Sequence, residues 1–208
     1  MSANVNLLNA THTVTGANIF TSSVTIGNQS SKVWPFSRVI VYSTPGSNTW
    51  TVPSGVGMFK VTCIGGGGGG GAHPYYGGGG GGGGASIKWV YNVSAGSAIA
   101  YTVGAGGTAG NTGGTTSFGS YCNATGGTSN SVLGGVGGMG TLGDLNFAGQ
   151  VGLHGKTIPG CGDFHGQGGG SYMGGGGDAN AVGRAYGGGG GGGPTGKAGA
   201  DGVVIIEY

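Results

Sequence analysis

Side chains that could catalyse a reaction are few in this chain and lie far apart in its sequence. The 208 residues contain five carboxylate side chains, at Asp144, Asp163, Asp178, Asp201 and Glu207. Cleavage of a polysaccharide needs two carboxylates held on opposite sides of the bond that breaks. Enzymes that carry such a pair on a long β-helix are also much longer than this chain. We therefore expect a protein that is not an enzyme.

Side chains that bind metals are present, but their spacing is unlike that of a zinc motif. His154 and His165 lie near Cys161 and Asp163, without the short paired spacings of zinc ligands. His12 offers an alternative, because in a trimer its copies could meet on the symmetry axis and bind an ion. Histidines more often serve as plain polar residues, so we expect neither a metal nor another cofactor.

Phosphate and nucleic-acid binding are not indicated either. Residues 192–198 resemble a P-loop only superficially, because Lys197 is followed by alanine and no helix pattern follows. Lysines and arginines are scattered singly, the net charge is +2, and only 6% of residues are charged. Such a chain has no electrostatic attraction to nucleic acid or to an anionic membrane. We expect no nucleic-acid partner.

Four insertions between glycine-rich segments carry side chains that could bind another molecule. They are residues 72–76, 153–165, 171–173 and 178–186. Aromatic rings stack on sugars, polar side chains bond to hydroxyl groups, and Tyr and Arg are frequent interface anchors. The alternative is that these aromatic residues only cover the ends of the glycine-rich structure. The candidate binding residues are His73, Tyr75, Tyr76, Asp163, Phe164, His165, Tyr172, Arg184 and Tyr186.

Glycine supplies 60 of the 208 residues, and its longest runs are residues 65–71, 77–84 and 187–193. Disorder is one interpretation, but 36% of residues are hydrophobic and strand-like segments bracket the glycine-rich part. Polyproline-II geometry has three residues per turn and no internal hydrogen bonds. Its N–H and C=O groups therefore point outward, and glycine lets neighbouring helices approach closely enough to bond to them. The runs predict a lattice of packed polyglycine-II helices.

Strand signals surround these runs. Residues 47–52 and 58–64 flank a turn at 53–57, and residues 85–93 and 98–103 flank a turn at 94–97, which predicts two hairpins. Residues 115–124 predict two more short strands, and residues 202–208 predict a buried strand. The expected fold is mostly β, with short antiparallel strands forming a base beneath the glycine lattice, and little or no α-helix.

The first 45 residues differ from the rest, because they hold few glycines and many Thr, Ser, Asn and Val. Residues 14–27 read as short β-segments with little apolar surface of their own. We expect residues 1–45 to be an attachment or trimerisation segment and residues 46–208 to be the glycine-rich domain. A poorly ordered tail is the alternative for the first segment. The start resembles no signal peptide, and no apolar run approaches the ~20 residues of a membrane helix.

An odd number of cysteines cannot all pair within one chain. Cys63, Cys122 and Cys161 are therefore expected to be small buried residues in a reducing compartment.

The order of these motifs resembles the glycine-rich domain at the C-terminus of many phage tail-fibre proteins. The resemblance lies in residues 48–56 and 60–64 before the first run, in 114–119 leading to 124–127, and in the closing residues 196–208. It covers roughly residues 45–208 and extends to T-even-type adhesins, in which variable loops on polyglycine-II helices bind receptors. Residues 13–16 are weakly similar to short repeats in trimeric tail-fibre shafts.

This resemblance implies a tail-fibre tip adhesin that recognises a bacterial polysaccharide or outer-membrane protein. Other virion tail or fibre proteins would hold its N-terminal segment, and the protein would be located in the virion. That segment is shorter than the attachment domain of T-even adhesins, so a monomeric cap and a homotrimer stay open, with the homotrimer favoured. A structural fibre or decoration protein without receptor binding is the alternative function.

Overall fold

The computed structural model describes residues 38–208. The β-segments expected within residues 14–27 and His12 lie outside the described residues. The described part contains no helix and consists of β-strands and extended segments, which confirms the expected mostly-β class. The strands are β1 (Val39–Tyr42), β2 (Gly46–Thr51), β3 (Met58–Ile64), β4 (Ala85–Tyr91), β5 (Ala98–Val103), β6 (Thr116–Phe118), β7 (Cys122–Ala124), β8 (Gly140–Thr141), β9 (Leu145–Phe147), β10 (Lys156–Ile158), β11 (Gly162–Phe164) and β12 (Val203–Glu207).

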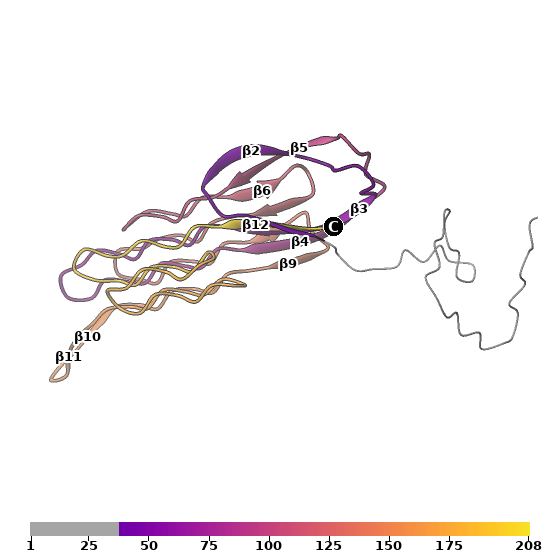
Figure 1. The fold of residues 1–208 in the computed structure, drawn as a ribbon. Helices are drawn as coiled ribbons and strands as arrows, with labels where there is room; N and C mark the ends of the chain where they lie inside the picture. Colours follow the sequence, from indigo (N-terminus) through magenta and orange to yellow (C-terminus); the bar gives the residue numbers. More distant parts are fainter. Residues whose placement is uncertain (1–37) are drawn as a thin grey trace, which may run out of the picture. The chain divides into compact units, whose positions relative to one another are not determined.

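Two antiparallel sheets form a sandwich at one end of this part of the chain (Figure 1). One sheet has the order β1-β12-β3-β4-β9 and the other β2-β5-β6-β7-β8. Alternate residues of the strands face inward, so Phe59, Val61 and Cys63 of β3 are fully buried. Trp50 of the second sheet meets Phe59 edge to face, with ring centroids 5.0 Å apart. β1 lies within the segment expected at residues 1–45 and pairs with β12.

The two hairpins expected from turns 53–57 and 94–97 are wrong. β2 pairs with β5, and β3 pairs with β4 and β12, so each turn carries the chain from one sheet to the other. The turns lie side by side, because Val52 donates its N–H to the carbonyl of Ser97. Crossing between sheets buries large apolar side chains from both strands in one core, which pairing within a hairpin would not do.

The pairing of β3 with β4 continues directly into the glycine runs that follow. Ile64 faces Ala85 at the last strand pair. Gly65 then donates its N–H to the carbonyl of Gly84 at 3.0 Å. Further bonds in the same register follow at every third residue, and they join Gly68 to Gly81 and Gly71 to Gly78. This spacing is that of a helix with three residues per turn, so the strands become polyglycine-II helices without changing partners.

Other strand pairs extend in the same way. β12 and β3 continue through Gly67–Ala200 and Gly70–Lys197, and β7 and β8 through Thr125–Met139 and Thr128–Val136. β4 and β9 continue through Gly82–Gln150 and Gly79–Leu153. The sandwich therefore sets the register of the glycine lattice, and the expected base of strands beneath a lattice is confirmed.

The three pure glycine runs, residues 65–71, 77–84 and 187–193, are the centre of this lattice. Within residues 78–84, successive N–H groups donate hydrogen bonds to three neighbouring segments in a repeating order. These segments are residues 125–131, 150–153 and 187–190. The same run accepts bonds from three further segments, so neighbours surround it on all sides. A Cβ atom on Gly80 would lie 2.2 Å from the carbonyl oxygen of Gly68. No side chain fits there, which explains why these runs contain only glycine.

Outer segments also carry larger residues, at positions that face away from the centre. In residues 133–139 every third residue is larger than glycine. The helix has three residues per turn, so these residues all lie on the same outward side. Leu133, Val136 and Met139 occupy those outward positions and are exposed. On the neighbouring segment, Thr125 is exposed and Thr128 is half-buried. In residues 133–139, the glycines therefore mark the positions that face neighbouring segments.

Candidate functional site

Turns between lattice segments lie alternately at the two ends of the lattice, because successive segments run in opposite directions. At the end away from the sandwich, Ala72 pairs with Gly193, Gly78 bonds to Ser131 and Asn180 bonds to Gly192. The hairpin β10–β11 projects from this end (Figure 1). We call these turns together the tip surface: residues 72–76, 108–111, 130–132, 154–165, 178–180 and 193–196.

The turn at residues 72–76 is fixed by its own histidine. The Nδ1 atom of His73 accepts the N–H of Tyr75 at 3.3 Å and that of Tyr76 at 3.2 Å. The His73 ring stacks on Tyr76 with centroids 3.8 Å apart. Tyr75 is left 57% exposed. The turn therefore presents one exposed tyrosine ring beside a stacked pair, on two glycine helices that are bonded to each other.

The hairpin β10–β11 lies beside that turn. Its strands are joined by Thr157, which donates its hydroxyl to Asp163 at 2.6 Å, and Phe164 is exposed. His165 then returns to the lattice, where its Nδ1 atom accepts the N–H of Gly77 at 3.0 Å. The structure thus brings the candidates of the first two insertions, from residues 73 to 76 and from 163 to 165, onto one surface.

The other three candidates come from the third and fourth insertions. Tyr172 belongs to a turn on the sandwich side, where its ring stacks on Phe147 of β9 at 5.0 Å. Tyr186 is half-buried where sheet and lattice meet, packed against a small apolar cluster that includes Ile64. Arg184 bonds to Asp178 at 3.1 Å, with both side chains exposed. The structure does not bring these tyrosines to the tip surface.

Sequence reasoning missed several turns of the tip surface. Residues 130–132 and 193–196 carry no aromatic side chain and were not among the candidate insertions. Asn180 lies at the tip, where its amide oxygen approaches Gly193. The order of the turns along the chain could have identified them. Successive segments run in opposite directions, so every second turn lies at the same end of the lattice. Cys161, expected to be buried, is instead exposed in the turn between β10 and β11, whereas Cys63 and Cys122 are buried as expected.

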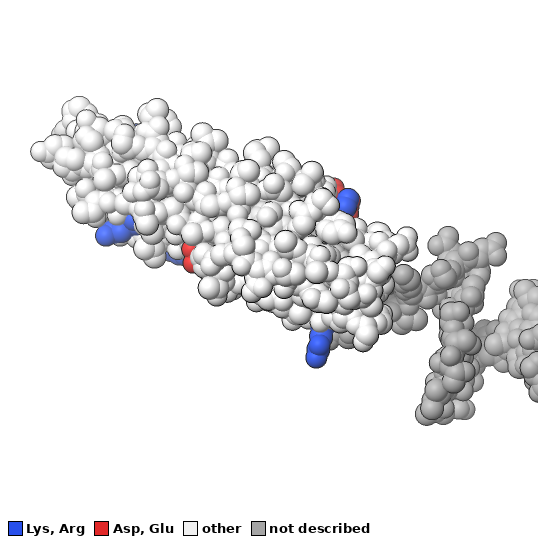
Figure 2. Space-filling model, turned by 90° about the horizontal axis from the view of Figure 1, so that it is seen from above, with Lys and Arg blue, Asp and Glu red and all other residues white. Residues whose placement is uncertain are grey.

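Charged groups are sparse over the visible face (Figure 2). Lys60 pairs with Glu207 and Lys88 with Asp144, both at 2.6 Å. The hydrogen bond from Lys88 holds the pKa of Asp144 below its usual value. Within residues 38–208, no three His, Cys, Asp or Glu side chains converge to hold a metal ion, and no membrane-spanning helix is found.

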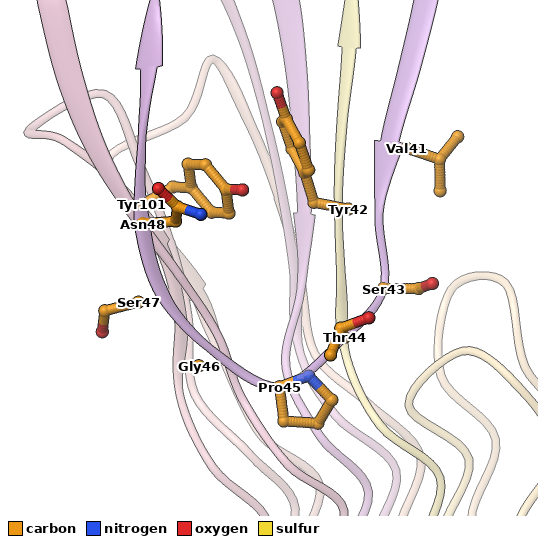
Figure 3. A pocket seen from close by; sticks show the side chains of 9 residues that line it. All are labelled: Val41, Tyr42, Ser43, Thr44, Pro45, Gly46, Ser47, Asn48 and Tyr101. Atoms are coloured by element: carbon orange, nitrogen blue, oxygen red, sulfur yellow. The ribbon is translucent and has the colours of Figure 1, made fainter.

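A hollow of about 400 Å³ lies at the sandwich edge between β1 and β2 (Figure 3). Tyr42 and Tyr101 stack at its wall with centroids 4.3 Å apart, and burial raises the pKa of both phenols. The rest of its lining is residues 43–48 and Val41. It offers hydroxyl and amide groups but no carboxylate, imidazole or thiol, so it has no group for acid–base or nucleophilic chemistry at neutral pH.

A family comparison matches residues 43–208 to the glycine-rich domain. The chain belongs to this family. The match covers every described strand except β1, and it covers all three central runs. No curated protein matches the chain.

Proposed function

We propose that this glycine-rich domain protein is the receptor-binding tip of a phage tail fibre. In this proposal the tip surface contacts a polysaccharide or an outer-membrane protein of the bacterial host. The protein performs no catalysis and needs no metal or cofactor. Residues 1–45 join it to other virion tail or fibre proteins, and the particle carries it as a homotrimer.

The observation that carries the proposal is the separation of two ends. Arg38 and Tyr208 bond to each other at 2.9 and 3.0 Å at the sandwich end, where the described chain begins and finishes. The turns that bear the exposed side chains of Tyr75 and Phe164 lie at the other end of the lattice. A protein attached through the segment before Arg38 would hold these turns outward.

The lattice also gives those turns a fixed platform. Both ends of turn 72–76 enter central glycine runs whose amides are bonded on every side. Loops that are positioned by a rigid scaffold are where binding residues concentrate. Rigid tyrosine rings bind with little loss of conformational entropy, since they have few rotatable bonds. Tyr75, Tyr76 and Phe164 are the side chains we assign to receptor contact, with His73, Asp163 and His165 holding their turns.

The test is adsorption of purified protein to a panel of bacterial strains, with infection blocking as the functional readout on a strain that binds. The double variant Tyr75→Ala, Tyr76→Ala should lose at least tenfold in binding, as expected for interface aromatic residues. Tyr91→Ala is a matched control, because Tyr91 is as exposed as Tyr75 but lies on β4 of the sandwich. Protein that binds no strain and blocks no infection would fit a structural spacer instead.

A further inference from the structure

One edge of the molecule carries an apolar surface that the tip does not explain. Residues 133–153 form a single antiparallel hairpin, which runs along the lattice through β8, turns at 142–144 and returns through β9. We call it the apolar hairpin. Its large apolar side chains are 37–60% exposed: Leu133, Val136, Met139, Leu142, Leu145, Phe147, Val151 and Leu153.

These side chains lie on two arms that are bonded to each other along their length. Gly152 donates its N–H to Gly135 and Gly149 to Gly138, both at 2.9 Å. This register places Val136 opposite Val151 on the two arms. Repetition every three residues stacks Leu133, Val136 and Met139 in one row, about 9 Å apart. Tyr172 extends the surface, since its ring stacks on Phe147.

The lattice itself does not require apolar residues at these positions. The neighbouring segment carries threonines at the same three-residue spacing, with Thr125 exposed and Thr128 half-buried. Both threonine side chains bond to the arm that bears Val136 and Met139. Outward valine, leucine and methionine are therefore a property of this edge, and a covering partner accounts for them.

The area of the surface matches a protein interface. Half-exposed side chains of this size each offer about 80–100 Å², so the eight of the apolar hairpin present about 640–800 Å². The largest apolar patch on a typical monomer is about 300–600 Å². A standard interface buries about 800 Å² per partner. The apolar hairpin therefore has the area that a stable association of two chains needs.

The charges indicate what that partner is. Residues 133–153 contain no lysine or arginine, and their one carboxylate, Asp144, is bonded to Lys88 and to the N–H of Trp89. Such a surface meets a copy of itself without repulsion between like charges. It also lacks the basic rim of a surface that binds anionic lipid. We propose that the apolar hairpin is the contact between copies of this chain.

The test compares the full chain with two double variants by sedimentation equilibrium. Val136→Lys with Val151→Lys places charges in the centre of the apolar hairpin and should weaken association at least about 100-fold. Val39→Lys with Val41→Lys is the control, because these valines are similarly exposed on β1, at the opposite edge of the same sheet. The control should associate like the unmodified chain.

The trimerisation expected through residues 1–45 calls for a second measurement that reads the apolar hairpin directly. A photo-crosslinking amino acid at position 136 should join two copies, and the same amino acid at position 41 should not. Absence of crosslinks from position 136 at about 100 µM protein overturns the proposal. So does a monomeric full chain that instead sediments with phosphatidylcholine vesicles, which would assign the apolar hairpin to lipid.

Discussion

The amide nitrogen of Gly68 lies 2.8 Å from the carbonyl oxygen of Gly81, in the register set by Ile64 and Ala85 in the sandwich. Neither glycine has a side chain that could specify which residue it pairs with. The choice is made by the apolar strands β3 and β4, whose alternation fixes which residues face each other. The sandwich thus specifies the lattice, and the lattice in turn carries the tip surface.

Gly80→Ala should unfold the lattice or destabilise the protein by about 3 kcal/mol or more, because the added Cβ would overlap the backbone of Gly68 and Gly69. Its nearest atom would be the Gly68 oxygen at 2.2 Å. Gly175→Ala is the matched control, since the nearest atoms to its Cβ are 3.7 Å away on the Arg184 side chain. Thermal unfolding should show a large loss for the first variant and little change for the second. Equal losses would contradict a close-packed centre.

Amide hydrogen exchange should be slow in residues 65–71, 77–84 and 187–193, because their N–H groups are buried and bonded. The N–H of Gly175 has no bonded partner among the described residues and should exchange quickly. Exchange in the native protein, followed by fragment mass spectrometry, measures both. Rapid and uniform exchange across the central runs would mean that the glycines form a flexible chain, and the platform for the tip would be lost.

Iodoacetamide should label Cys161 alone in the folded protein. Cys161 is exposed, whereas Cys63 and Cys122 are buried in the sandwich core. Burial raises the pKa of the Cys63 thiol well above its ordinary value, so little reactive thiolate forms there. Mass spectrometry should find one label on the native chain, none on Cys161→Ser, and labels on all three cysteines after unfolding in urea. A native Cys161→Ser chain that still takes label would contradict the buried sandwich core.

Asp144→Asn should lower stability at neutral pH by up to about 1 kcal/mol, since the ion pair with Lys88 is partly exposed. The hydrogen bond from Lys88 lowers the pKa of Asp144 below its ordinary value of 3.8. The ionised carboxylate therefore contributes its full stabilisation when the pH is above that ordinary pKa. This contribution is lost as the pH falls through the lowered pKa. The melting temperatures of the two proteins should therefore converge in acid, and a constant difference at every pH would contradict this role.

Much of the fold follows from local sequence patterns. The alternation in residues 58–64 and the apolar run at 202–208 predict β3 and β12. The glycine runs predict polyglycine-II helices, because this geometry lets backbone groups of neighbouring segments bond to one another without side chains. Strand pairing could not be predicted in the same way. Turn 53–57 looks like a hairpin, and only the shared core of Trp50 and Phe59 reveals that it crosses between sheets.

The candidate site was predicted in part for a related reason. The insertion at residues 72–76 lies between two pure runs, so its place at a lattice end follows from sequence. Tyr172 and Tyr186 have the same residue type and similar flanking glycines, yet their turns lie toward the sandwich. Residue type therefore suggests which side chains could bind another molecule. The end of the lattice at which each side chain lies follows only from counting turns from the sandwich.

The pairing of β1 with β12 has a mechanical consequence. β12 runs away from the tip surface, and β1 runs antiparallel to β12. A force that pulls the tip and Arg38 apart therefore acts along both strands, in opposite directions. Bonds pulled along the strand direction must break together, whereas bonds peeled from one end break singly. A load from the tip would therefore be shared across the whole β1–β12 ladder before the chain could begin to unravel.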